Sequence, residues 1–189
     1  MRKLTFSMIL IAVSVFANAQ DLTFKPFKFD IATGYAHPGG GSGAKGGLLF
    51  AFEPKYALND NLTLGLRMEA ALMVRASVNA TEEEVNGDAK ASASYLATAD
   101  YYFNTNSFRP FAGVGAGLYR TATADLSTTT TEEDVHTANK FGFAPRVGFE
   151  FGHFRTAIEY NVAGKTGKIS NNYLGVKFGF FIGGGRVSD

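Results

Sequence analysis

The chain has 189 residues, 46% of them apolar and 19% charged, with 22 Gly, 18 Phe and no Cys. This length suits one domain, and without cysteine the sequence has no disulfide, no thiolate metal site and no cysteine nucleophile. A formal net charge of +1 gives nucleic acid no electrostatic reason to bind, and a mean hydropathy of -0.02 excludes a bundle of transmembrane helices.

The first 19 residues have the layout of a secretory signal peptide. Arg2 and Lys3 give a positively charged start, an apolar stretch runs from Leu4 to Phe16, and Ala17-Asn18-Ala19 matches an A-x-A cleavage site. We therefore expect two segments, a signal peptide at residues 1–19 and one domain at residues 20–189. Export would remove two basic residues and leave the mature chain with a net charge of -1.

From Pro26 onward, apolar and polar residues alternate in segments of about ten residues, which is the pattern of half-buried β-strands. Eight strands are predicted, at residues 27–36, 47–56, 62–75, 93–103, 109–118, 141–151, 154–162 and 173–182. Pro54 and Pro145 lie inside two of them, and each removes a ladder hydrogen bond. We expect a bulge or a nearby strand end at each proline.

In every predicted strand the charged residues share one face, and the other face is uncharged. The charged faces carry Lys28, Asp30, Glu53, Lys55, Arg67, Glu69, Arg75, Asp100, Arg109, Arg146, Glu150, Arg155, Glu159 and Lys177. The uncharged faces hold so many Phe and Tyr that they would overfill the interior of an eight-stranded barrel. We therefore predict an all-β fold, an eight-stranded antiparallel up-and-down transmembrane β-barrel, with charges in the lumen and apolar rows toward lipid.

The connections between the predicted strands alternate in length. Long ones cover residues 37–46, 76–90, 119–140 and 163–172, and short ones lie near residues 59–61, 104–108 and 152–153. Outer-membrane barrels have long loops outside the cell and tight turns in the periplasm. With an even number of strands, both ends of the mature chain are then periplasmic.

Three segments resemble the strand motifs of a known family. They are residues 108–119 (FRPFAGVGAGLY), 149–152 (FEFG) and 173–180 (YLGVKFGF). The family is that of the small outer-membrane β-barrels, which includes OmpA-like and OmpX-like barrels, and the resemblance covers essentially the whole mature chain. It implies a monomer in contact with outer-membrane lipid, inserted by the outer-membrane assembly machinery.

The charged lumen residues allow two interpretations. Buried carboxylates and basic groups must pair, since an unpaired buried charge costs several kcal/mol. The network is therefore either a plug of salt bridges that holds the barrel in shape, or a thin ion path. We favour the plug, because eight strands leave too little room for an aqueous channel.

Few residues suggest other chemistry. His37, His136 and His153 fall in two loops and a turn, on no predicted strand, so we expect no catalytic site, no metal site and no cofactor. Two acidic clusters occupy the second and third loops, namely Glu82, Glu83 and Glu84, and Glu132, Glu133 and Asp134. They could hold a divalent cation or meet a basic partner, but we favour solvated tips whose charge prevents edge-to-edge pairing.

The sequence thus predicts a non-enzymatic protein of the cell outer membrane. Its role would be membrane integrity or surface interaction through four external loops, with a surface partner that the sequence does not name and with no nucleic acid. The alternatives are a narrow ion channel or porin-like protein, an outer-membrane lipid-modifying enzyme, and a secreted lipid-binding barrel.

Overall fold

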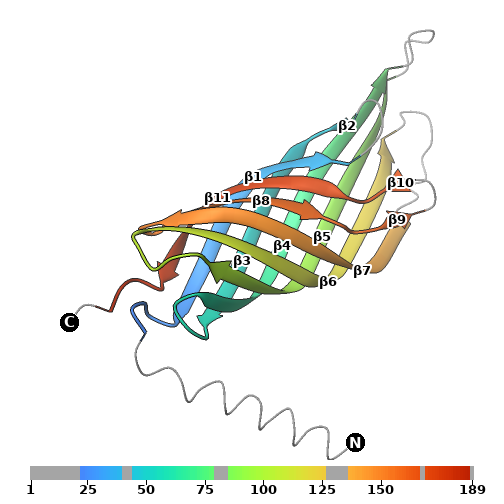
Figure 1. Cartoon of the computed structure of the whole chain (residues 1–189). Helices are drawn as coiled ribbons and strands as arrows, with labels where there is room; N and C mark the ends of the chain where they lie inside the picture. The colour runs from blue at the N-terminus through green and yellow to red at the C-terminus, as the bar shows by residue number, and fades with distance from the viewer. Residues whose placement is uncertain (1–21, 40–43, 79–84, 127–135, 167–168, 188–189) are drawn as a thin grey trace, which may run out of the picture.

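The computed structural model describes residues 22–39, 44–78, 85–126, 136–166 and 169–187, and these residues form β-strands and their connections (Figure 1). The strands are β1 (Phe27–Pro38), β2 (Ala44–Lys45), β3 (Gly47–Ala57), β4 (Leu62–Val78), β5 (Val85–Tyr102), β6 (Phe108–Leu126), β7 (His136–Phe151), β8 (Phe154–Asn161), β9 (Lys165–Thr166), β10 (Ile169–Ser170) and β11 (Tyr173–Gly183). Within these ranges no helix is long and apolar enough to cross a membrane.

Eight long strands close into a barrel. Their order is β4-β3-β1-β11-β8-β7-β6-β5, and the pairing of β4 with β5 completes the circle. Every neighbouring pair is antiparallel. The short β2 adds to the edge of β4, and β9 pairs with β10 in a small hairpin. The predicted eight-stranded antiparallel barrel is confirmed.

The strands are staggered around the barrel. Ala57 N donates a hydrogen bond to Pro26 O, and a path across paired residues runs through Ala57, Thr63, Asp100, Gly113, Arg146, Glu159, Gly175 and Ala36. The path starts beside Pro26 and returns at Ala36, ten residues further along the same segment. Such a stagger tilts the strands by about 40°. Each step from β1 through β3, β4, β5 and β6 therefore moves toward the loop end.

The short turns and both described terminal segments lie at one end of the barrel (Figure 1). Thr23 N donates to Asp60 Oδ2 over 3.1 Å in the first turn, and Arg186 Nη2 donates to Thr105 O over 2.9 Å in the second. Phe24 and Arg186 form an isolated antiparallel bridge. The two terminal segments are thus fastened to each other and to the turn end.

Two predicted loops are largely strand instead. The pairs Val78↔Val85 and Gly87↔Leu126 extend β4, β5 and β6 far into residues 76–90 and 119–140, and β7 begins at His136. The prediction of two long loops was wrong because it ended each strand at the point where apolar and charged residues no longer alternate clearly. Small and β-branched residues continue there and support pairing without a lipid-facing row.

Neither proline produces a bulge. Phe29↔Pro54 and Val114↔Pro145 keep their registers with β1 and β6. Between β3 and β4, the pairing skips Pro54 and continues from Phe52↔Met68 to Lys55↔Gly65 in the same register. Each proline therefore interrupts one ladder without adding a residue, as expected from a missing N–H.

Burial follows the predicted alternation of faces. Outward residues are exposed, for example Leu66 at 64%, Phe141 at 74% and Phe180 at 66%. Inward residues such as Leu49 and Leu96 are buried. A soluble monomer rarely exposes an apolar surface that continues around the whole molecule, so the outward face is suited to lipid.

This difference between faces predicts the result of a fluorescence test. The sequence has no Trp, so a single tryptophan at Leu66 or at Leu96 reports one face alone. In vesicles of brominated lipid, we expect Leu66→Trp to be quenched several times more strongly than Leu96→Trp, because only the former touches lipid. Equal quenching of two variants that both fold would contradict the assignment of the faces.

Candidate functional site

The charged residues of the barrel gather inside it. Thirteen of the fourteen predicted lumen residues are at most 7% exposed: Lys28, Asp30, Glu53, Lys55, Arg67, Glu69, Asp100, Arg109, Arg146, Glu150, Arg155, Glu159 and Lys177. We call these thirteen the lumen network. The side chain of the fourteenth, Arg75, lies outside the described part, as do both acidic clusters at residues 82–84 and 132–134.

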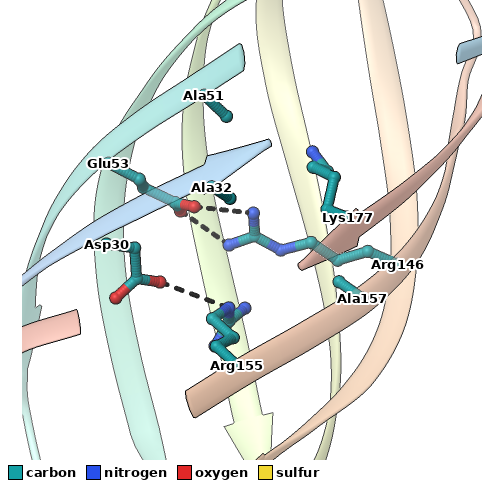
Figure 2. Close-up of a pocket in the computed structure, with 8 residues that line it drawn as sticks. All are labelled: Asp30, Ala32, Ala51, Glu53, Arg146, Arg155, Ala157 and Lys177. Carbon is teal, nitrogen blue, oxygen red and sulfur yellow. Dashed lines mark hydrogen bonds and ion pairs between the residues drawn. The ribbon is translucent and has the colours of Figure 1, made fainter. Parts of the chain in front are cut away.

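Arg146 on β7 is the centre of the network. Its Nη2 and Nη1 donate to Glu53 Oε1 and Oε2 on β3 over 2.7 and 3.0 Å (Figure 2). Its Nε donates to Asp100 Oδ1 on β5 over 2.7 Å. A guanidinium that binds one carboxylate through two nitrogens and a second through the third is held in a single orientation.

Two further cations share the same carboxylates. Lys55 Nζ lies 2.7 Å from Asp30 Oδ2 and 2.9 Å from Asp100 Oδ2. Arg155 Nη2 lies 2.8 Å from Asp100 Oδ2, and its Nε lies 3.2 Å from Asp30 Oδ2. Asp100 therefore faces three cations, and Asp30 faces two.

Toward the turn end, one carboxylate oxygen of Glu150 accepts hydrogen bonds from three donors. Lys28 Nζ, Arg155 Nη1 and the Tyr102 hydroxyl lie 2.5, 2.6 and 2.5 Å from Glu150 Oε1. Below them, the guanidinium of Arg109 stacks 3.9 Å from the ring centre of Phe24, which is 8% exposed. The N-terminal segment thus packs against the turn-end mouth of the barrel.

Toward the loop end, a second group of charges is paired. Arg67 bonds Glu159 and donates to Asn161 Oδ1 over 3.0 Å. Lys177 Nζ lies 2.7 Å from Glu69 Oε2 and 3.0 Å from Glu159 Oε1. Beyond this group lies a buried apolar cluster, formed by Ala36, Leu49, Ala71, Met73, Leu96, Tyr119, Ala144, Ala163 and Tyr173.

Glycine provides the room that this packing needs. A Cβ at Gly65 would lie 2.9 Å from Glu53 Oε1 and 2.7 Å from Thr98 Oγ1. A Cβ at Gly113 would collide with Asp100 Oδ1. Both glycines belong to the inward rows, so a larger residue at either position would displace a charged side chain.

A small cavity of about 30 Å3 remains between the charges (Figure 2). Its lining consists of Asp30, Ala32, Ala51, Glu53, Arg146, Arg155, Ala157 and Lys177. A space of this size holds water and little else.

The histidines lie apart from this network. His37 and His136 fall on β1 and β7 and not in loops, because both strands are longer than predicted. His153 lies in the turn after β7, with Nδ1 2.9 Å from Phe181 O. Among the described residues, no three His, Cys, Asp or Glu side chains are placed to hold a metal ion.

Charge patterning overlooked the neutral members of the site. Tyr102, Tyr173, Asn161 and Thr98 all bond charged residues of the network. Their signal was present in the sequence, because each lies on the inward row of its strand. Counting hydroxyl and amide side chains along with charges would have found them.

Comparisons with known proteins give one family. The model of the outer membrane protein beta-barrel domain matches residues 6–181. The crystal structure of Neisserial surface protein A is 16% identical with a TM-score of 0.54, and the match covers 83% of this chain and 96% of that one. The outer membrane protein OprG of Pseudomonas aeruginosa is 14% identical with a TM-score of 0.51, over 86% and 100%. These two likenesses concern the fold alone, and no curated protein sequence matches the chain.

The geometry around Arg146 predicts a large loss of stability on its removal. Arg146→Gln would leave Glu53 and Asp100 without their main partner in a buried position, which costs about 3–5 kcal/mol. Urea unfolding of the folded protein in detergent micelles measures this change. Lys25→Gln, which alters an exposed lysine outside the lumen network, serves as the control and should unfold like the wild type. Equal stability of all three proteins would contradict the role of the network.

Proposed function

The chain belongs to the outer membrane protein beta-barrel domain family, and on this premise we propose that it is a non-enzymatic barrel that serves membrane integrity or surface interaction. The observation that carries the proposal is the combination of an apolar outward face with a lumen filled by paired charges. Such a molecule is stable in a bilayer. The groups that it can offer to another molecule are then those outside the membrane.

The network supports a closed lumen in preference to an ion path. Arg146 on β7 pairs with Glu53 on β3, four strands away around the barrel, and Arg155 on β8 pairs with Asp100 on β5, three strands away. An ion could pass only after several of these pairs had separated, and each separation leaves buried charges without partners. We therefore propose that the network is structural, a plug that also fixes the barrel's shape.

The loop end supports a role at the cell surface. On β6 the outward row changes from Leu118, which is 58% exposed, to the exposed Arg120, so the apolar band ends there. The strand nevertheless continues to Leu126, and its partner β5 reaches back to Val85. This extension of β4 to β7 would stand in water and present ordered backbone to a partner.

The orientation follows from the same features. We propose that residues 1–19 are a signal peptide, that the turn end faces the periplasm, and that the outer-membrane assembly machinery inserts a monomer with both mature termini in the periplasm. The separation of His37, near the loop end, from His153, at the turn end, supports a role without catalysis. That the acidic clusters at residues 82–84 and 132–134 are solvated loop tips remains a prediction.

Membrane fractionation with gel migration tests the central proposal. A closed barrel satisfies its backbone internally and resists detergent until it is heated. We expect the protein in the outer-membrane fraction, with a band that shifts in the gel after boiling. A soluble protein without a heat-dependent shift would refute the proposal.

Planar-bilayer recording tests the plug. Wild-type protein should give no sustained conductance, because the lumen network fills the cross-section. A sustained conductance that is abolished by Glu69→Gln or Arg146→Gln would favour the ion path instead. Protein that shows the heat-dependent shift must be used, so that an unfolded sample is not mistaken for a closed one.

A further inference from the structure

A groove of about 410 Å3 crosses the outward face of the barrel on β1, β3, β4 and β5. Its lining includes Ile31, Phe50, Met68, Ala70, Ala93 and Tyr95. The two alanines are the small residues of this set, and the exposed side chains of Phe50, Met68 and Tyr95 stand around them. The exposed side chains around the groove are therefore apolar, and the charged residue in its lining, Glu69, is buried.

From β3 to β5, the groove runs toward the loop end of the barrel. Its residues are linked by the pairs Phe50↔Ala70 and Ala70↔Ala93, and the next pair in the same direction is Ala93↔Arg120. Because the strands are staggered, each of these steps rises along the barrel axis. The line of the groove thus leads from the apolar band to Arg120.

Arg120 has the chemistry of a headgroup ligand. It is exposed on the outward row, two residues beyond Leu118, at the point where the apolar band ends. Its cross-strand neighbours are Ala93 and Asn139. No hydrogen bond or ion pair joins its guanidinium to the other described residues. An exposed guanidinium at this level matches a phosphate, which it can bind through two nitrogens.

We propose that the groove and Arg120 together bind a phosphate-bearing lipid of the leaflet at the loop end. An acyl chain lies in the groove over Ala70 and Ala93, and the lipid phosphate accepts hydrogen bonds from Arg120. This inference rests on the proposed function, since it requires a barrel inserted in the outer membrane. It adds a site for one kind of lipid to a surface that otherwise contacts any membrane lipid.

A second groove on the same face provides the comparison. It measures about 610 Å3, and its lining includes Tyr56, Leu66, Ala97, Val114 and Ala116. Following its line across the next pair leads from Ala116 to Phe143, which is apolar and 50% exposed. The one charged residue in its lining, Lys55, is buried and paired within the lumen network, so this groove should take acyl chains without preference for a phosphate.

The test measures lipid retention by the folded full-length mature protein. The protein is incubated in detergent with diphosphorylated lipid A in a background of phosphatidylcholine, exchanged into fresh detergent, and analysed by native mass spectrometry. Arg120→Gln removes the phosphate ligand, and Ala93→Phe fills the groove. Arg120→Gln should lower the retained lipid A by about tenfold, the scale of one charge-assisted hydrogen bond. Ala93→Phe should lower it by a similar factor, because the acyl chain loses its place in the groove.

Two matched variants serve as controls. Lys25→Gln removes an exposed cation at the turn end, and Ala97→Phe fills the second groove on the same strand. Both should retain lipid A like the wild type. The heat-dependent gel shift identifies variants that have folded, and Ala93→Leu, which also fills part of the groove, replaces Ala93→Phe if the latter does not fold.

Three outcomes would overturn the site. These are unchanged retention in Arg120→Gln, equal losses in Ala93→Phe and Ala97→Phe, and equal retention of dephosphorylated and intact lipid A. Displacement of lipid A by inorganic phosphate at equal concentration would also overturn it, because the acyl chain would then contribute nothing. Failure of the proposed function would look different, as a wild-type protein outside the membrane or without a gel shift.

Discussion

The structure depends on the pairing of charges in an interior that is buried from bulk solvent. A barrel of eight strands has an interior just wide enough for side chains, so a charge inside it must find its partner there. Arg146 is 4% exposed and meets Glu53 and Asp100, residues from strands far apart in the sequence. These partners meet only when the barrel is closed in its proper register. Charge pairing and barrel closure therefore stabilise each other.

The period of two along a strand connects this interior to the membrane. On β4, Arg67 and Glu69 point inward while Leu66 and Met68 point outward. Each strand thus contributes to the charged network and to the lipid-facing surface at once. A slip of one residue would expose charges to lipid and bury apolar side chains among charges, so both faces specify the same register.

Along its axis the barrel has three zones. At the turn end, Phe24 packs on Arg109 at the mouth. The paired charges occupy the middle, and an apolar cluster with Leu49 and Leu96 covers them toward the loops. Under the proposed function, interactions with other molecules would then involve the outward wall and the extension of β4 to β7.

The sequence by itself determined the fold class, the number of strands and the face on which each residue lies, because alternation is a local property of a strand. It placed Arg146, Glu53 and Asp100 on inward rows, and by parity it also placed Tyr102 and Asn161 there. It did not determine where β4 to β7 end, since the apolar contrast fades before pairing does. Only the tertiary structure decided which charges meet and that Arg120 lies on the line of a groove. Which residues come close together depends on the stagger between neighbouring strands. Closure of the barrel sets this stagger, so it cannot be read from the sequence of any single strand.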